Sequence, residues 1–243
     1  MNLLKQLLFV SFFFLSGNVV AQIGPYTCDA PNDIKKMYWD DAIYLSNNLI
    51  FSDSLSYMDS VDVPPFYLDT VLWALLAVYN AHLPATDSVI GYKIHSFALP
   101  LNPITVEETA NASWVKQLRL GNIPTGDIAI DSLMEKYSLK PIRRIRATSR
   151  QVDFGTDLPV NPNALAKAFR KLPTVKRAFE HLPVMMHSLG KSITAKRHPD
   201  YITLTYYLGW GDCPAGCTAS HQWVFNVYFD WSVEVVSSTG QQP

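Results

Sequence analysis

The longest regular pattern in the chain is an alternation of apolar and polar residues near the C-terminus. Apolar residues occupy every second position over Ile202–Leu208 and again over Trp223–Trp231. A period of two is typical of strands that are buried on one face. The pattern therefore predicts a β-hairpin over Tyr201–Trp231, with a loop at Gly209–Ser220. The apolar side chains on one face of the hairpin must be buried against another layer of structure. We therefore expect the hairpin to pack on the preceding module or on a helix at Val71–Tyr79.

Apolar residues recur at helical spacing in the first third of the chain. After Asp33, which is a suitable helix cap, Ile34, Met37 and Tyr38 fall on one face. The stretch Val71–Tyr79 predicts a second, buried helix. It is too short to cross a bilayer of about 30 Å, so no membrane span is predicted.

Strand and helix patterns alternate through the middle of the chain. Helices are predicted after Asn111, after Thr125-Gly126 and after Asn161-Pro162, where an Asn cap precedes a proline at the first helical position. Strands are predicted at Ile90–Leu99, Ile142–Ser149, Gln151–Phe154 and Val175–Leu182. Such an order packs most simply as helices on one side of an antiparallel sheet, the βαββαβ arrangement of ferredoxin-like folds.

The predicted fold class is therefore α+β. It has an antiparallel sheet with helices on one face (a ferredoxin-like βαββαβ core), N-terminal helices and a C-terminal β-hairpin. The predicted division places an N-terminal helical segment at 22–85, the ferredoxin-like module at 86–185, and the hairpin, packed on that module, at 186–243.

Residues 1–21 have the pattern of a signal peptide. Lys5 supplies the positive start, Leu7–Leu15 the apolar run, and Val19-Val20-Ala21 a small-residue cleavage site. We therefore expect secretion to the extracellular space or a periplasm, where disulfides persist.

The formal charge is only −1, but it is unevenly distributed. Residues 22–135 carry 14 acids and 5 bases, whereas residues 136–200 carry 14 bases and 4 acids. In one interpretation the basic 136–200 region binds a polyanion. In the other, the acidic and basic halves face each other or form solvated surfaces. We favour the second, because the bases are interleaved with apolar residues, and we predict no specific nucleic-acid ligand.

The segment GWGDCPAGC, followed by His221, is the most unusual stretch. In the first interpretation, Cys213 and Cys217 form a disulfide that constrains the hairpin loop. In the second, both cysteines bind zinc with His221 and Asp212. In the third, a cysteine is a nucleophile and His221 its base. We favour the disulfide, because the sequence identifies no partner to orient the histidine and a full zinc set depends on Asp212 or another segment. Cys28 is left free or pairs with one of the other two.

The remaining candidates show no catalytic or metal-ligating pattern. The acidic pairs Asp40-Asp41 and Glu107-Glu108 point their carboxylates in different directions, which favours solvated faces. No GxSxG, P-loop or GxGxxG motif occurs, and we predict no cofactor and no catalytic residue. The other histidines are scattered and are expected to be ordinary surface or core residues: His82, His95, His181, His187 and His198.

Two segments resemble known families. Residues 158–182 (LPVNPNALAKAFRKLPTVKRAFEHL) resemble the second half of the subtilisin-propeptide-like module, in which a strand, a helix that ends at a proline turn, and another strand follow one another. Asp131–Leu139 would be the first helix of that module. The C-terminal GWGDCPAGC segment, with His221 and Trp223, resembles the end of secreted bacterial proteins of unassigned function. The positions that match the propeptide pattern are Leu165, Phe169, Leu172, Val175 and Glu180.

The propeptide resemblance implies binding to a protease, as an inhibitor or folding aid. No protease domain follows in this sequence, which leaves a separate inhibitor or an adhesion module. We therefore expect a secreted, non-enzymatic binding module whose partner is a protease or another extracellular protein. The alternatives are a thiol- or zinc-dependent enzyme centred on Cys213, Cys217 and His221, and a polyanion-binding protein that uses residues 136–200.

Overall fold

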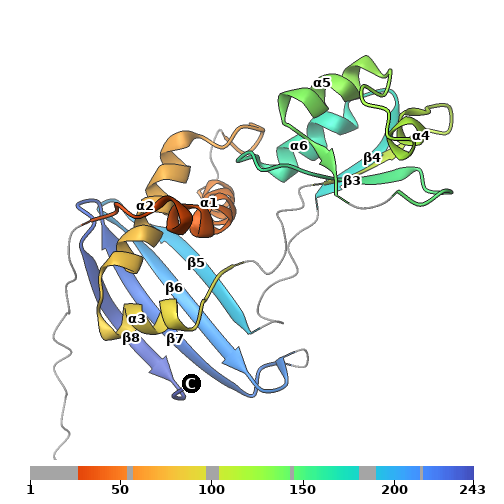
Figure 1. The fold of residues 1–243 in the computed structure, drawn as a ribbon. Coiled ribbons are helices and arrows are strands. Elements are labelled where there is room, and N and C mark those ends of the chain that lie inside the picture. Colours follow the sequence, from red (N-terminus) through yellow and green to blue (C-terminus); the bar gives the residue numbers. More distant parts are fainter. Residues whose placement is uncertain (1–26, 54–56, 97–103, 143–144, 181–189, 214–215) are drawn as a thin grey trace, which may run out of the picture.

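The computed structural model describes residues 27–53, 57–96, 104–142, 145–180, 190–213 and 216–243. The predicted signal peptide at 1–21 lies outside these residues. The described chain forms six helices and two four-stranded antiparallel sheets (Figure 1), so the predicted α+β class is confirmed. Among these residues, no helix has both the length and the apolar run that crossing a bilayer requires.

The two sheets come from different parts of the chain. The helices are α1 (Asn32–Ser52), α2 (Pro65–Asn80), α3 (Pro84–Gly91), α4 (Trp114–Arg119), α5 (Ile128–Lys136) and α6 (Pro162–Arg170). The middle sheet contains β1 (Ile104–Glu108), β2 (Lys140–Pro141), β3 (Gln151–Gly155) and β4 (Val175–Glu180). The C-terminal sheet contains β5 (Lys191–Arg197), β6 (Tyr201–Trp210), β7 (Ala219–Tyr228) and β8 (Val233–Gly240).

The C-terminal sheet has the strand order β5-β6-β7-β8 and contains the predicted hairpin as its two central strands. Leu204 pairs with Phe225, and Tyr206 with Trp223, as the period-two pattern requires. These four side chains are buried on one face of the sheet. Their burial shows that this face is the inner one.

Helices from the first third of the chain cover that inner face. Figure 1 shows α1 and α2 lying over the C-terminal sheet, and α2 contacts both β6 and β7. Buried residues of α1 and α2, such as Leu45 and Leu75, belong to the same apolar cluster as Phe225. The hairpin was expected to pack either on the preceding module or on the helix at Val71–Tyr79. The structure shows that it packs on α2, the helix that includes Val71–Tyr79. The first and last thirds of the chain share one core.

The middle sheet has the strand order β2-β3-β1-β4, and all neighbouring strands are antiparallel. Its own apolar cluster combines α4, α5 and α6 with one face of β1, β3 and β4. The three predicted helices are confirmed. Helix α6 begins where the sequence predicts, because the Asn161 side chain accepts hydrogen bonds from the backbone N–H groups of Asn163 and Ala164, at 3.1 and 3.3 Å.

The predicted strand at Ile90–Leu99 is wrong over its described part. Helix α3 ends at Gly91, residues 92–96 form no strand, and residues 97–99 lie outside the described residues. Helix α3 starts at Pro84. The Thr86 hydroxyl accepts a hydrogen bond from the Leu83 backbone N–H and donates one to the Leu83 carbonyl oxygen. The first strand of the middle sheet is β1, which was not predicted because its alternation is short: only Ile104 and Val106 are apolar among its five residues.

The predicted strand at Ile142–Ser149 is also wrong. Of the described residues in this region, the sheet takes only Lys140 and Pro141, and Arg146–Ser149 forms a turn closed by a 3.0 Å backbone hydrogen bond. The Arg146 side chain in this turn is exposed. Residues 143–144 lie outside the described residues. Strand β3 then begins at Gln151, as predicted.

The loop that connects α1 to α2 binds the start of helix α6. The Asn161 side-chain amide donates to the Met58 carbonyl oxygen at 3.1 Å, and the Asn161 backbone N–H donates to Val61 O at 2.8 Å. Lys167 on α6 forms an exposed 2.7 Å ion pair with Asp59. At this contact an acidic segment faces a basic one, as the favoured interpretation of the charge pattern expects.

Replacing Asn161 with alanine removes both the cap of α6 and the bond to Met58. We expect Asn161→Ala to lower the free energy of unfolding by about 1–2 kcal/mol, measured by urea denaturation. Asn163→Ala is the matched control, because only the backbone of Asn163 takes part in the cap. An equal effect of the two substitutions would contradict the capping role.

Candidate functional site

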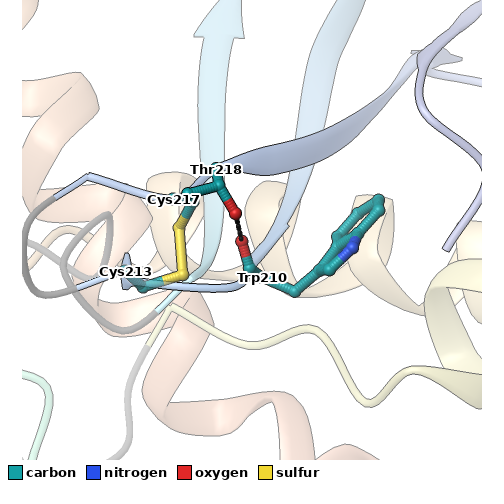
Figure 2. Close-up of a disulfide and its surroundings, with 4 residues drawn as sticks. All are labelled: Trp210, Cys213, Cys217 and Thr218. Carbon is teal, nitrogen blue, oxygen red and sulfur yellow. Dashed lines mark hydrogen bonds between the residues drawn. A yellow bond between two sulfur atoms is a disulfide. The ribbon is translucent and has the colours of Figure 1, made fainter.

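The two cysteines singled out by the sequence lie together at the end of the β6–β7 hairpin. A disulfide joins Cys213 to Cys217, and the Thr218 hydroxyl donates to the Trp210 carbonyl oxygen at 3.5 Å (Figure 2). Gly211 has a positive φ of 86°, and a Cβ there would collide with the Thr218 hydroxyl. A Cβ on Gly209 would collide with the Cys217 sulfur. Both glycines are therefore required for the loop to close.

With the two sulfurs bonded to each other, neither is a thiolate that could attack a substrate or bind a metal. The pairing is the one that the first interpretation expects. Cys28 is a free thiol, half-buried against the helical core, and burial raises its pKa. Asp212 is exposed in the same loop. Within the described residues, no group of three or more His, Cys, Asp or Glu side chains is placed to hold a metal ion.

His221 is buried on β7, and both of its ring nitrogens have partners. Nδ1 lies 2.7 Å from the carbonyl oxygen of Gln241, and Nε2 lies 2.8 Å from the hydroxyl of Ser238. Because a carbonyl oxygen only accepts, Nδ1 carries a proton, and Nε2 pairs with the Ser238 hydroxyl, which can donate or accept. The ring also packs on Trp223, at 4.3 Å between centroids. In this arrangement His221 fastens the C-terminal tail to β7.

The structure reveals a buried carboxylate that the sequence analysis expected to be solvated. Asp41, on α1, is only 2% exposed. One carboxylate oxygen lies 2.6 Å from His95 Nδ1, and the other accepts from the backbone N–H of Ser96 at 2.5 Å. The Ser96 hydroxyl in turn donates to the Ile193 carbonyl oxygen on β5. The group ties α1, the residues after α3 and the C-terminal sheet together.

His95 is 23% exposed, and its ring lies 5.3 Å from that of Tyr38. Burial, together with the nearby Asp41 carboxylate, raises the Tyr38 pKa. The pair has the geometry of a carboxylate that orients an imidazole. No described group of three metal-ligating side chains accompanies it, and the neighbouring Ser96 hydroxyl is engaged by the Ile193 carbonyl oxygen. We therefore assign it a positioning role in the core.

The face of the middle sheet opposite α4–α6 carries the second missed group. We call it the polar face, and cross-strand pairing places on it Thr105, Glu107, Gln151, Asp153, Arg177 and Phe179. Glu107 lies at its centre, although the sequence analysis expected a solvated carboxylate. Its neighbour Glu108 is buried as well, and accepts from the backbone N–H of Val115 at the start of α4.

Three side chains hold the Glu107 carboxylate. Lys176 Nζ and Arg177 Nε each lie 2.8 Å from its oxygens, and the Gln151 amide donates at 3.0 Å. These hydrogen bonds, from Lys176 first and then from Gln151 and Arg177, lower the pKa of Glu107 to about 2. The same face holds a 2.5 Å hydrogen bond from the Thr105 hydroxyl to Asp153. The cluster is preorganised before any partner arrives.

The other histidines are not brought together. His82 is exposed, 3.7 Å from Asp87, and His198 stacks on Tyr201. His181 and His187 lie outside the described residues.

Comparison of the chain with protein-family models, curated proteins and solved structures finds no match.

Thiol counting tests the cysteine assignment. The denatured but unreduced protein should react at one thiol per chain, Cys28, and at three after reduction, because only Cys213 and Cys217 are paired. The reduced protein should lose about 2 kcal/mol of stability at most, since the closed ring is small. Three reactive thiols without reductant would contradict the assignment.

The Glu107 cluster predicts a pH dependence. Because folding lowers the pKa of Glu107 from 4.5 to about 2, its contribution to stability is complete above pH 4.5 and is lost as the pH falls towards 2. The difference in unfolding free energy between wild type and Glu107→Gln should therefore shrink over that range in urea titrations. Glu135→Gln, at an exposed position on α5, should show no such change. A constant difference at Glu107 would refute the ion-pair account.

Proposed function

We propose that this chain is a secreted, non-enzymatic binding module that docks on a subtilisin-like protease through the polar face of the middle sheet. One observation carries the proposal. A preorganised charge cluster around Glu107 lies on the same face as Phe179, which is 39% exposed. An apolar anchor within a ring of fixed polar groups is the usual anatomy of a protein interface.

The strand order supports the ferredoxin-like part of the proposal. The chain runs through β1, α4 and α5, β2, β3, α6 and β4, and these strands lie in the order β2-β3-β1-β4. A βαββαβ chain whose crossovers each skip one strand is expected to have this order. Leu165 and Phe169, two positions of the propeptide resemblance, are buried in α6. Val175 and Glu180 begin and end β4.

Secretion is supported by two independent features. The first 21 residues have the three-part pattern of a signal peptide. The disulfide between Cys213 and Cys217 is of a kind that persists in oxidising compartments. Either a periplasm or the extracellular space suits both features.

A binding role is favoured over the thiol- or zinc-dependent enzyme because the residues of that alternative already have other partners. The two sulfurs bond each other, and both nitrogens of His221 are engaged. The polyanion alternative is also weakened. Lys167, Lys176 and Arg177, all in the basic region, form ion pairs with acids of the same chain.

The face is a better docking surface than the strand edge. Among the described strands, β4 pairs only with β1 and so lies at the edge of the middle sheet. However, Arg170 donates from Nη1 to the Ala178 carbonyl oxygen at 2.7 Å, which occupies an acceptor that an added strand would compete for. We therefore place the protease on the face and not along the edge.

The proposal predicts inhibition of subtilisin-like proteases by the mature protein. Phe179→Ala should raise the inhibition constant about tenfold, because it removes an apolar contact with the protease that is worth about 1.4 kcal/mol. Ile128→Ala is the control, since Ile128 is 84% exposed on α5, on the helical side of the same module. Peptide hydrolysis and isothermal calorimetry measure the effect.

Two results would refute the proposal. The first is a panel of subtilisin-like proteases that neither bind nor are slowed by an excess of the folded protein. The second is complex formation that Phe179→Ala and Ile128→Ala weaken to the same extent.

A further inference from the structure

The most exposed large apolar side chains of the middle module lie in one short segment. We call residues 120–128, which run from the end of α4 to the first residue of α5, the apolar loop. Leu120 and Ile123 are each 64% exposed, and Ile128 is 84% exposed. Among the large apolar residues of the described chain, only Phe51 reaches a similar value, at 66%. Large apolar side chains that gather in one exposed segment are typical of an interaction site.

Hydrogen bonds hold the apolar loop in a fixed shape. The Asp131 carboxylate accepts from the backbone N–H groups of Thr125 and Gly126, at 2.7 and 3.0 Å, and from the Thr125 hydroxyl at 2.8 Å. Near the α4 end of the loop, the backbone N–H of Asn122 donates to the Gln117 carbonyl oxygen at 3.0 Å, and its side-chain amide donates to Gln117 Oε1 at 2.7 Å. Because the backbone is already ordered, a partner would pay little conformational entropy to order the loop.

Basic side chains flank the α4 end of the apolar loop. Lys116 is exposed on α4, one helical turn before the loop begins. Arg119 donates from Nη2 to the Ser149 carbonyl oxygen at 2.7 Å, which places the residues around Ser149 beside the end of α4. The chain on the two sides of this contact, at 110–126 and 145–150, contains four bases and no acid: Lys116, Arg119, Arg146 and Arg150. This part of the module therefore matches an anionic partner.

The acids near the apolar loop do not cancel this charge. Asp127 accepts from two backbone N–H groups at the start of α5, and the positive end of the helix dipole offsets both its charge and that of Asp131. Glu135 is exposed, but it lies about two helical turns beyond the loop and directly beside Lys136. Glu108 is buried and bonded to the start of α4. The exposed charge at the α4 end of the loop is therefore positive.

The chemistry of the exposed side chains favours a lipid bilayer over a protein partner. Hot spots of protein interfaces are enriched in Trp, Tyr and Arg, which fill pockets in the partner. The apolar loop contains no aromatic residue and presents aliphatic side chains instead. A bilayer surface can surround a protruding aliphatic side chain on all sides, and its anionic headgroups attract the bases that flank it.

We propose that the apolar loop inserts into the surface of a bilayer rich in anionic phospholipid. Its three large apolar side chains enter the boundary between headgroups and acyl chains, while Lys116 and Arg146 bind headgroup phosphates. The module then lies on the membrane without crossing it. The loop extends from the helices on one side of the middle sheet, and the Glu107 cluster lies on the opposite face, so the two surfaces act separately.

Cosedimentation with lipid vesicles tests the insertion. The mature protein should bind vesicles of phosphatidylglycerol mixed with phosphatidylcholine, and high salt should weaken this binding without abolishing it. Ile123→Ser and Ile128→Ser should each lower the partition coefficient about tenfold, since each removes an inserted apolar side chain. Phe51→Ser is the matched control, because Phe51 is as exposed as Ile123 but lies on α1. It should leave vesicle binding unchanged.

Neutralising the bases tests the choice of lipid. Lys116→Gln and Arg146→Gln should each weaken binding to the phosphatidylglycerol vesicles about fivefold, and should not change the weaker binding to phosphatidylcholine alone. Lys140→Gln is the matched control. Lys140 is exposed in the same module but pairs with Gly155, at the end of β3 that is remote from Ser149.

Four results would overturn the proposal. The first is no binding to either kind of vesicle, and the second is an equal loss of binding for Ile123→Ser and Phe51→Ser. The third is binding that salt abolishes and Ile123→Ser does not change, which indicates headgroup contact without insertion. The fourth is a dimer, formed without lipid, that Ile123→Ser dissociates. Phe179→Ala should not affect vesicle binding, so the membrane and protease proposals can fail independently.

Discussion

The apolar row along β6 and β7 is the constraint on which the rest of the structure depends. Burying a large apolar side chain contributes about 1.5–3 kcal/mol, so a row that includes Tyr206, Trp223 and Phe225 strongly favours a cover. That cover comes from α1 and α2, at the other end of the sequence. The chain must therefore bring its first and last thirds together. Residues 104–180, with their own core, are inserted between α3 and β5.

This arrangement explains why the most conspicuous chemical groups have structural partners. The Cys213–Cys217 disulfide closes the tip of the hairpin, and His221 fastens the tail that follows β8. Asp41 ties α1 to the backbone just before the inserted module. The helices leave one face of each sheet uncovered, and on the middle sheet this face carries the charged cluster centred on Glu107.

The sequence predicted elements whose signals are local. Strict alternation identified β6 and β7, and the Asn161-Pro162 pair identified the start of α6. It missed β5 and β8, in which Ile193 and Val233 are the only fully buried apolar residues, so the alternation is weak. The Glu107 cluster could not be predicted from the sequence for a different reason. Its partners come from β3 and β4, and only tertiary pairing brings them within 3 Å of the carboxylate.

Hydrogen exchange on the native protein tests the shared core most directly, with Phe225→Ala as the perturbation. Phe225 is fully buried between the C-terminal sheet and the helices. If the first and last thirds fold as one unit, the substitution should lower the protection of amides in α1 and α2 as much as in β6 and β7, and leave those of β1 and β3 unchanged. Loss of protection confined to β6 and β7, with α1 and α2 unaffected, would contradict the account.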